Sequence, residues 1–269
     1  MPEPSEYILG TNDSELDRLG VQHRIWRDLT NAVLDRAGVA SGMTVLDLGC
    51  GPGFVTEELA RRVGPTGQVV ALDESPRWHE VLRSRSFDAP VELVESQIQA
   101  ADLGEGRFDA VYSRWVFSFL DELDAVCAQV QRSLKPGGRL IVQDYNHEGI
   151  SSFPRSPGFE AVVRATREYY RRAGGDAWVM GRLPSAARRA GLPTTELRPN
   201  GLAGDATSPV FHWFDIFFPK FSGTFREEGL ITADEHDQYL SEWAALKANP
   251  DALFYSPMVV DLIATKSSA

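Results

Sequence analysis

Short apolar runs alternate with helix-forming segments along the first half of the chain. The runs ending at 48, 72 and 94 are typical of strands buried on both faces, and residues 106–113 and 139–143 continue the series. Helical spacing is found at 77–86 and 120–134, and another helix is expected to begin near Phe54. This alternation predicts an α/β domain.

The N-terminal region and the part beyond Asp144 are predicted to be mainly helical. Residues 14–29 and 30–37 suggest two consecutive helices, the first capped by Ser14, and 159–172 and 183–190 suggest two more. Strands are expected at 194–198 and 252–266. Pro257 predicts an edge or bulge position for the last strand, because proline cannot donate to a sheet ladder.

Aromatic residues crowd the segment before that last strand: Phe211, Trp213, Phe214, Phe217, Phe218 and Phe221. They either anchor an accessory helical layer on the core or form a lid whose inner face shapes an apolar pocket. On the second interpretation Phe211, Phe214 and Phe218 are candidates for the pocket wall.

A glycine-rich loop directly follows the first strand, in the order Asp47-Leu48-Gly49-Cys50-Gly51-Pro52-Gly53. Glycines remove the Cβ atoms that would keep a ligand from the backbone, and they permit positive φ where the turn needs it. Asp47 suits an ammonium group better than a pyrophosphate. The segment predicts a strand, a tight ligand-binding turn and a helix.

This stretch resembles the first motif of the class I S-adenosylmethionine-dependent methyltransferases. The resemblance implies a Rossmann-like seven-stranded α/β sheet with helices on both faces, an N-terminal helical extension and a helical lid insertion. It also implies that the methionine end of S-adenosylmethionine is held by this loop, with contacts from Asp47, Gly49, Cys50, Gly51 and Gly53.

Later landmarks extend the resemblance to about residue 144. Asp73, at the end of the second strand, matches the acid that binds ribose hydroxyls in such folds, with Glu74 beside it; the alternative is that Asp73 caps the next helix. Gln97 and Ile98 occupy the adenine-binding loop, where the family usually has Asp, although Asp102 could take the polar role in another alignment.

The fourth strand is introduced by Phe108-Asp109, as in the family, and ends at Ser113 and Arg114. Ligands of doubly wound sheets bind at the carboxyl ends of the strands, so both residues are cofactor candidates and Trp115 is a candidate for the substrate pocket. Arg114 could instead serve a helix terminus, and Trp115 could simply pack in the core. The Leu-Lys-Pro-Gly-Gly-Arg-Leu run at 134–140 is a structural landmark of the family.

The segment 7–23 resembles the N-terminal extension that covers the cofactor in small-molecule members of the family. This implies a cofactor contact for Gln22 and a place in the substrate pocket for Tyr7. The alternative is a surface helix docked by its apolar face.

Composition narrows the range of partners and compartments. The net charge of −11 and the pI near 5.0 disfavour a nucleic-acid substrate, because phosphate binding needs basic surface. Two cysteines, Cys50 and Cys127, predict no disulfide framework, and the start of the chain lacks an apolar core. We expect a cytoplasmic protein that does not span a membrane; whether it forms a homodimer is open.

Metal chemistry finds little support, because the five histidines are scattered without the spacing of metal ligands. His147, just past the fifth strand, is the best-placed histidine for a general base near pH 7, and a surface-loop role is its alternative. A sulfonium is already an activated leaving group, so methyl transfer mainly requires alignment of the reacting groups.

We therefore predict a metal-independent methyltransferase that uses S-adenosylmethionine, acts on a small organic molecule by in-line displacement and releases S-adenosylhomocysteine. Two alternatives are a protein of this fold that binds the cofactor without methylating and a nicotinamide-dependent oxidoreductase, which would need G-x-G-x-x-G after the first strand. The predicted layout is one domain over 1–269, with a helical cover (1–40), a cofactor core (41–145), helical lid segments (146–182 and 200–250) and the end of the sheet (183–199 and 251–266).

Overall fold

A seven-stranded sheet forms the centre of the protein. The computed structural model describes residues 11–268, and its strands lie in the order β3-β2-β1-β4-β5-β10-β7. The first five are parallel, and β10 runs antiparallel between β5 and β7. The strands are β1 (Thr44–Leu48), β2 (Gln68–Asp73), β3 (Val91–Glu95), β4 (Phe108–Arg114), β5 (Leu134–Asn146), β7 (Thr194–Asn200) and β10 (Met258–Thr265). This confirms the predicted seven-stranded α/β fold.

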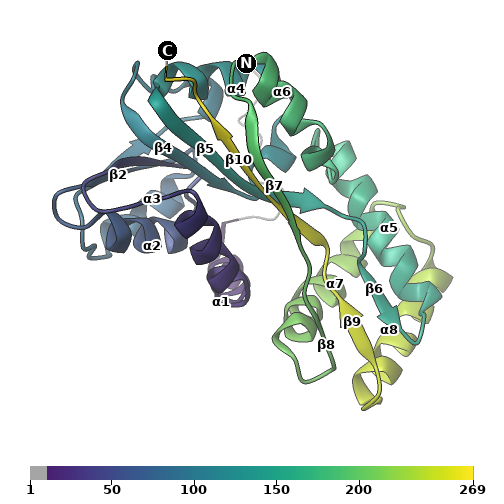
Figure 1. Ribbon diagram of the computed structural model, residues 1–269. Helices are drawn as coiled ribbons and strands as arrows, with labels where there is room; N and C mark the ends of the chain where they lie inside the picture. The colour runs from purple at the N-terminus through teal and green to yellow at the C-terminus, as the bar shows by residue number, and fades with distance from the viewer. Residues whose placement is uncertain (1–10, 269) are drawn as a thin grey trace.

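Helices cover both faces of this sheet (Figure 1). On one face Val45 and Val69 pack against α1 (Asp13–Arg36) and α2 (Phe54–Val63), and Ala71 packs against α3 (Pro76–Arg83). On the other face Leu46 and Val70 pack against α4 (Leu123–Ser133) and α6 (Leu183–Arg189). Because successive side chains of a strand point to opposite faces, a strand covered on both sides is apolar throughout, as the sequence pattern indicated.

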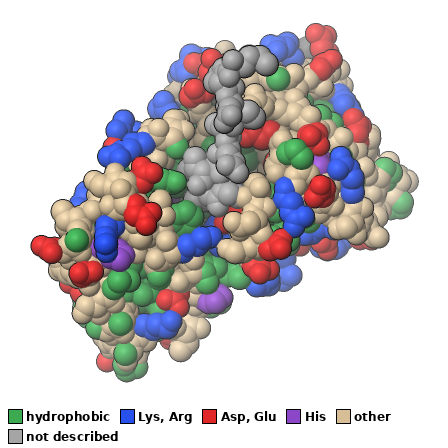
Figure 2. Space-filling view, turned by 180° about the vertical axis from the view of Figure 1, so that it is seen from behind, with side chains coloured by type: hydrophobic (Ala, Val, Ile, Leu, Met, Phe, Trp, Pro, Cys, Tyr) green, Lys and Arg blue, Asp and Glu red, His purple; other side chains and the backbone are tan. Residues whose placement is uncertain are grey.

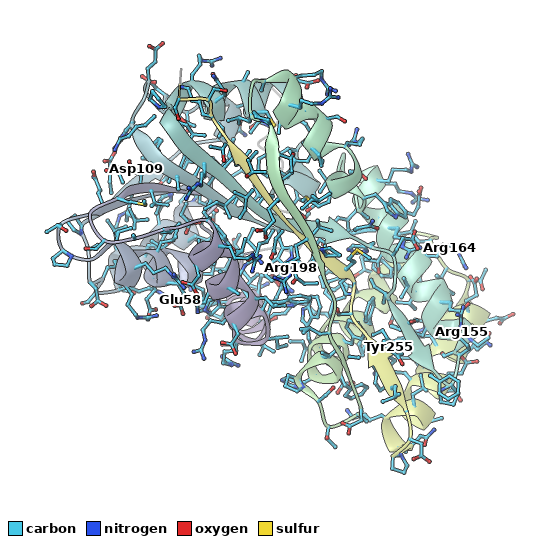
Figure 3. All side chains as sticks on the ribbon, in the orientation of Figure 1. Glu58, Asp109, Arg155, Arg164, Arg198 and Tyr255 are labelled. Atoms are coloured by element: carbon cyan, nitrogen blue, oxygen red, sulfur yellow. The ribbon has the colours of Figure 1, made fainter. Side chains whose placement is uncertain are left out.

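A second lobe holds the remaining elements. Helices α5 (Pro157–Arg172), α7 (Pro209–Glu227) and α8 (Ala233–Ala248) pack with a small sheet of β6 (Ser151–Phe153), β9 (Leu253–Tyr255) and β8 (Ala203–Gly204). Figure 3 marks the two parts: Glu58 and Asp109 lie in the large-sheet part, whereas Arg155, Arg164 and Tyr255 lie in the second lobe. Short 3-10 turns at Ile98–Ala100, Phe117–Phe119 and Val179–Gly181 complete the fold.

The N-terminal helix differs from the prediction. One continuous helix replaces the two expected at 14–29 and 30–37, and Asn12 rather than Ser14 caps it. The Asn12 side chain accepts a hydrogen bond from the Glu15 N–H at 3.0 Å, the usual contact of an N-cap. No proline or glycine interrupts the chain at 29–30, so the helix continues.

The predicted last strand at 252–266 is also different. The chain breaks at Ser256 and Pro257, so β9 joins the small sheet and β10 joins the large one. Proline lacks the N–H that a continuous ladder would use there, which accounts for the break. Of the edge or bulge position expected for this strand, the edge is wrong, because β10 pairs with a neighbour on each side, and its register irregularity lies at Ile263 and Ala264 rather than at Pro257.

Acidic and basic side chains are interspersed over the face shown in Figure 2, with no broad region of one sign. Among helices within residues 11–268, none is both long enough and apolar enough to cross a bilayer.

We predict that the contact between α5 and α8 tolerates no added volume at Gly158. A Cβ there would lie 2.5 Å from the Cα of Tyr239, and backbone cannot rotate away. Gly158→Ala should therefore lower the free energy of unfolding by about 1–3 kcal/mol. Gly223→Ala, also in a helix but with nothing within 4 Å of the added carbon, should be neutral or stabilise by about 0.5–1 kcal/mol. Urea denaturation of both variants checks this; equal effects would contradict it.

Candidate active site

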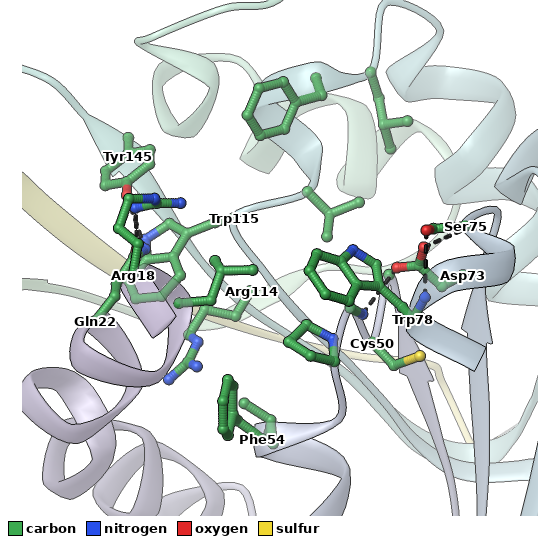
Figure 4. A pocket seen from close by; sticks show the side chains of 18 of the residues that line it. Arg18, Gln22, Cys50, Phe54, Asp73, Ser75, Trp78, Arg114, Trp115 and Tyr145 are labelled. Carbon is green, nitrogen blue, oxygen red and sulfur yellow. Dashed lines mark hydrogen bonds between the residues drawn. The ribbon is translucent and has the colours of Figure 1, made fainter. Parts of the chain in front are cut away.

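A cavity of about 380 Å³ lies at the carboxyl ends of β1, β2, β4 and β5, beneath α1 and α7. We divide its lining into two halves. The loop half comprises Asp47, residues 49–52, 73–75 and 96–99, and Arg114; the aromatic half comprises Trp115, Phe119, Tyr145, His147, Tyr170, Trp213, Phe214, Phe217 and Phe218. Figure 4 shows Asp73, Cys50 and Trp78 at one end of this cavity and Arg18, Gln22 and Tyr145 at the other.

The glycine loop reaches the cavity through its backbone. Gly49 and Gly51 have φ values of 74° and 53°, which glycine adopts without strain. A Cβ on Gly49 would meet Val116 at 2.4 Å, whereas a Cβ on Gly51 would meet nothing within 4 Å. Gly51 and Cys50 therefore border open space that a ligand can fill.

Gly53 does not belong to the cavity lining, which corrects its predicted ligand role. It caps α2 at φ 83°, and a Cβ there would lie 2.2 Å from a methyl carbon of Leu82. Its positive φ is what requires glycine, and the nearby Leu82 methyl adds to the crowding.

Asp73 lies on the cavity wall and organises the loop at the same time. Its carboxylate accepts the Gly51 N–H at 2.8 Å and the Ser75 N–H at 2.9 Å. Ser75, not Asp73, caps α3, so the alternative role of Asp73 as helix cap does not describe this structure. Each carboxylate oxygen retains a lone pair for a ligand. Burial raises the pKa of Asp73, and the two N–H bonds oppose that shift.

The adenine-loop candidates also line the cavity. Ile98 is buried and Gln97 is exposed at the rim, while Glu74 lies on the lining beside Asp73. Asp102 instead accepts the Gly104 N–H at 3.0 Å in its own turn and does not line the cavity. Trp78, which the sequence analysis missed, adds a buried ring to this wall. Of the two alignments, the structure brings Gln97 to the cavity.

Opposite charges face the cavity at the ends of β1 and β4. Asp47 accepts the Thr56 hydroxyl at 2.7 Å, and burial raises its pKa to about 6. Arg114 donates to the Thr30 hydroxyl at 2.9 Å and approaches Nδ1 of His23 at 3.2 Å. Within the described part of the chain it forms no ion pair, and burial lowers its pKa. A half-buried guanidinium without a carboxylate partner provides a strong site for an anion.

Ser113 does not line the cavity, which corrects its predicted cofactor contact. Its side chain is fully buried and donates to the Leu48 carbonyl at 2.9 Å. Side chains alternate along β4, so Ser113 faces away from the crevice that Arg114 enters.

The N-terminal helix contributes a polar corner to the cavity. Arg18 pairs with Glu15 through two N–H groups, at 2.8 and 2.6 Å, and donates to Gln22 at 2.6 Å. Gln22 in turn donates to the Tyr145 hydroxyl at 3.3 Å, a bond drawn in Figure 4. Gln22 thus lines the cavity, with its amide held by protein groups, and its cofactor contact stays a prediction. The Tyr7 prediction lies outside the described residues.

Trp115 both lines the cavity and packs in the aromatic cluster. Its ring stacks on Tyr145 at 5.8 Å with an interplanar angle of 18° and meets Trp26 edge-on at 6.2 Å. Its φ of 57° is unusual for a residue other than glycine and costs about 1–3 kcal/mol. Tyr145 was missed, although its position at the end of a central strand was a usable signal.

Helix α7 supplies rings to both the cavity and the core. Phe214 and Phe218 line the cavity as predicted, and Trp213 and Phe217 join them. Phe211 does not: it is buried 4.6 Å from the ring of Phe254 and 5.2 Å from that of Trp243, measured between centroids. Its predicted pocket role is corrected because its side of α7 faces the small sheet and α8.

His147 lines the aromatic half and is 5% exposed. Burial, with the Arg167 guanidinium nearby, lowers its pKa to about 3. Its Nδ1 atom is buried without a hydrogen-bond partner in the described structure. The surface-loop alternative is therefore wrong, and so is the expected pKa near 7. The ring is neutral at physiological pH.

Within residues 11–268, no group of three or more His, Cys, Asp or Glu side chains is arranged to hold a metal ion.

Comparison with known proteins matches the part of the chain that contains the loop half of the cavity. The methyltransferase domain family matches residues 46–142. Two relatives are ubiquinone/menaquinone biosynthesis C-methyltransferases: that of Hahella chejuensis is 29% identical, with 59% of this chain and 67% of the relative covered, and that of Pseudomonas putida is 34% identical, with 47% and 50% covered. The alignments thus span about half to two thirds of the relatives' length.

Solved structures share the fold over most of the chain. A candidate methyltransferase of Bacillus halodurans is 19% identical with a TM-score of 0.59, covering 88% of this chain and 98% of that one. The [4+2]-cyclase SpnF is 20% identical with a TM-score of 0.52, covering 90% and 82%. At these identities the likeness establishes the fold, and the cyclase shows that one fold accommodates different reactions.

The rings of α7 should separate into two kinds on truncation. Phe211→Ala should lower the free energy of unfolding by about 3–5 kcal/mol, because it opens a cavity inside the second lobe. Phe217→Ala should cost much less, because this ring is half-buried against the cavity, and should alter ligand binding there. Denaturant unfolding and titration with aromatic ligands, run on both variants, check this. Similar stability losses without any change in ligand binding would contradict it.

The depressed pKa of His147 should appear in the pH dependence of stability. In the unfolded chain His147 binds a proton as the pH falls through 6.5, whereas in the folded protein it stays neutral down to about pH 3. The unfolded state therefore binds more protons in this range, and stability that is present above pH 6.5 is lost as the pH falls. The wild-type advantage over His147→Gln should shrink by about 2 kcal/mol between pH 7 and 5. Buried Asp47 and Asp144, with pKa raised to about 6, act oppositely, so the variant is the necessary reference. A constant difference would contradict the neutral ring.

Proposed function

The chain belongs to the class I S-adenosylmethionine-dependent methyltransferase family, and from this we propose that it transfers a methyl group from S-adenosylmethionine to a small organic molecule. The observation that carries the proposal is the pair of opposite charges in the loop half. An α-amino acid group carries an ammonium and a carboxylate, and Asp47 and Arg114 offer the complementary charges on one cavity. The pyrophosphate of a dinucleotide would instead be repelled by the Asp47 carboxylate, because both groups are negatively charged.

The rest of the loop half fits the remainder of the cofactor. The open space beside Gly51 allows a ligand to approach the backbone, and Asp73 retains lone pairs for ribose hydroxyls. Ile98 and Trp78 offer apolar surface, and Gln97 offers an amide that can both donate and accept at an adenine edge. Glu74, Cys50 and Gln22 complete the proposed contacts.

When bound, the cofactor supplies a methyl group on a sulfonium, already activated for displacement. The protein then has to align the acceptor, exclude water and provide a group beside the proton that the acceptor releases. Helices α1 and α7 cover the cavity, and the aromatic half excludes water from its walls. We assign the proton-accepting position to His147, which acts as a neutral hydrogen-bond acceptor. Methylation of a hydroxyl oxygen gives a protonated ether, and methylation of a ring carbon of a phenol gives a protonated dienone. Both are far stronger acids than imidazolium, so even the weakly basic ring of His147 can accept the proton.

The charge of the protein and of its surface favours a small molecule over a nucleic acid as the acceptor. The chain carries a net charge of −11, and the face in Figure 2 has no broad basic region of the kind that phosphate backbones require. We propose a cytoplasmic enzyme in which 41–145 binds the cofactor and 146–182 with 200–250 covers the acceptor. A homodimer remains a proposal to be tested by sedimentation.

The competing function is a protein of this fold that binds the cofactor without methylating. It predicts cofactor affinity without labelled-methyl transfer to any acceptor. The nicotinamide alternative finds no support, since neither the loop spacing nor Asp47 suits a pyrophosphate.

Two substitutions should separate the two ends of the cofactor. Asp73→Ala should weaken both S-adenosylhomocysteine and 5′-methylthioadenosine about tenfold or more, because both contain the ribose. Arg114→Gln should weaken S-adenosylhomocysteine similarly but leave 5′-methylthioadenosine nearly unchanged, because the latter lacks the carboxylate. Calorimetric titration measures both.

The matched control for these titrations is Glu95→Ala. Glu95 is an exposed acid at the end of the neighbouring strand β3 and is not part of the cavity lining. Its removal should leave both affinities unchanged. Unaltered S-adenosylhomocysteine affinity in folded Asp73→Ala and Arg114→Gln proteins would overturn the proposed cofactor site.

A further inference from the structure

The aromatic half of the cavity contains no acidic side chain among its described lining residues. The acids on the lining, Asp47, Asp73 and Glu74, all belong to the loop half. Glu15 lies behind Arg18, is fully buried and receives two N–H groups from it. An ammonium-bearing acceptor would therefore be desolvated among rings without a counter-charge, which is costly even where cation–π contacts help.

Two basic side chains lie close to the aromatic half: Arg18 lines the cavity beside it, and Arg167 donates to the carbonyl of His147. The acids nearest to its Tyr170, Asp144 and Glu15, are fully buried and do not line the cavity; Asp144 accepts the N–H groups of Ser118 and Tyr145. These guanidinium groups disfavour a cation there. They do not offer a ready carboxylate site either, because Arg18 already donates to both oxygens of Glu15 and to Gln22.

Buried polar atoms without partners indicate which chemistry an acceptor would need. In the described structure Nδ1 of His147 and the indole Nε1 atoms of Trp115 and Trp213 are buried and make no hydrogen bond, and all three residues line the cavity. Buried polar atoms are normally paired. Indole nitrogen can only donate, whereas a neutral imidazole can also accept. A hydroxyl, which donates and accepts at one oxygen, satisfies both kinds.

We propose that the acceptor is a neutral aromatic hydroxyl compound whose ring lies among the side chains of the aromatic half and whose hydroxyl donates to His147. The assignment rests on the proposed function only in taking the loop half for the cofactor. The stacked pair of Trp115 and Tyr145 offers a flat surface, and Phe214, Phe217 and Phe218 of α7 close the opposite wall.

The neutral state of His147 agrees with this recognition. A protonated imidazole would be donor-only and would select an anion, whereas the neutral ring offers an acceptor to a hydroxyl. His147 is thus a specificity-determining residue as well as the proton-accepting one.

Four probes with one ring system test the proposal: 2-naphthol, 2-methoxynaphthalene, 2-naphthylmethylammonium and 2-naphthoate. Each is titrated at pH 7 into the full chain saturated with S-adenosylhomocysteine and followed by calorimetry. 2-Naphthol should bind about tenfold more tightly than each of the others, because it alone is neutral and carries a donor. His147→Phe should bring 2-naphthol and its methyl ether to within about threefold of each other.

The control variant is His212→Phe, which changes an exposed residue of α7 that does not line the cavity. It should retain the preference for 2-naphthol, and both variants should retain S-adenosylhomocysteine affinity.

Tighter binding of the ammonium or the carboxylate, equal binding of naphthol and its ether, or no binding of any probe would overturn the inference. So would an unchanged preference in His147→Phe. Whether the loop half binds the cofactor is a separate question, because titration with S-adenosylhomocysteine alone decides it. If that titration fails, the same four probes are added to the protein by itself and the comparison still decides.

Discussion

One side-chain amide joins the sheet, the N-terminal helix and the cavity. Oε1 of Gln143, on β5, accepts the hydroxyls of Thr30 at 2.7 Å and Tyr112 at 2.8 Å, and its Nε2 donates to Asp261 at 2.6 Å. Thr30 also receives the Arg114 guanidinium. The position of α1 over the sheet and the direction of Arg114 are therefore fixed by the same fully buried group. Satisfied networks of this kind hold one geometry, because each lost partner leaves another polar atom buried and unpaired.

This arrangement explains how far the sequence could predict the molecule. The strands and the glycine loop follow from local patterns: unbroken apolar runs mark strands covered on both faces, and glycines mark the turn. Asp47, Gly51 and Asp73 could be located because the carboxyl ends of parallel strands meet at one edge. The break at Pro257 was signalled but misread, since sequence alone does not show which sheet a strand joins. Phe211 was misplaced because aromatic rings lie on several sides of α7, and the sequence does not reveal which of them faces a cavity.

The pKa of His147 and the lack of a carboxylate partner for Arg114 could not be predicted from the sequence for a different reason. The expectation of a general base near pH 7 took the usual pKa of histidine for His147. The structure encloses this ring between Tyr145, 4.9 Å away between centroids, and Tyr170, at 5.7 Å, with Arg167 beside it. Tyr170 and Arg167 both come from α5, which is distant from His147 in sequence, so the desolvation could not be foreseen from the residues next to His147 alone. The same holds for Arg114, whose lack of a carboxylate partner depends on α1 offering it Thr30 and His23.

The two halves of the cavity differ in chemistry, as two different ligands, a charged cofactor and an apolar acceptor, would require. The loop half is rigid backbone with fixed charges, and it belongs to the part of the chain that matches the methyltransferase family. Most of the aromatic half comes from the end of β5, from α5 and from α7, which lie outside that match, whereas Trp115 and Phe119 lie within it. Polar contacts fix one position, whereas rings tolerate substitution of similar volume at modest cost. A chain built this way can retain its cofactor site while α7, which lies outside the matched segment, changes the surface that the acceptor meets.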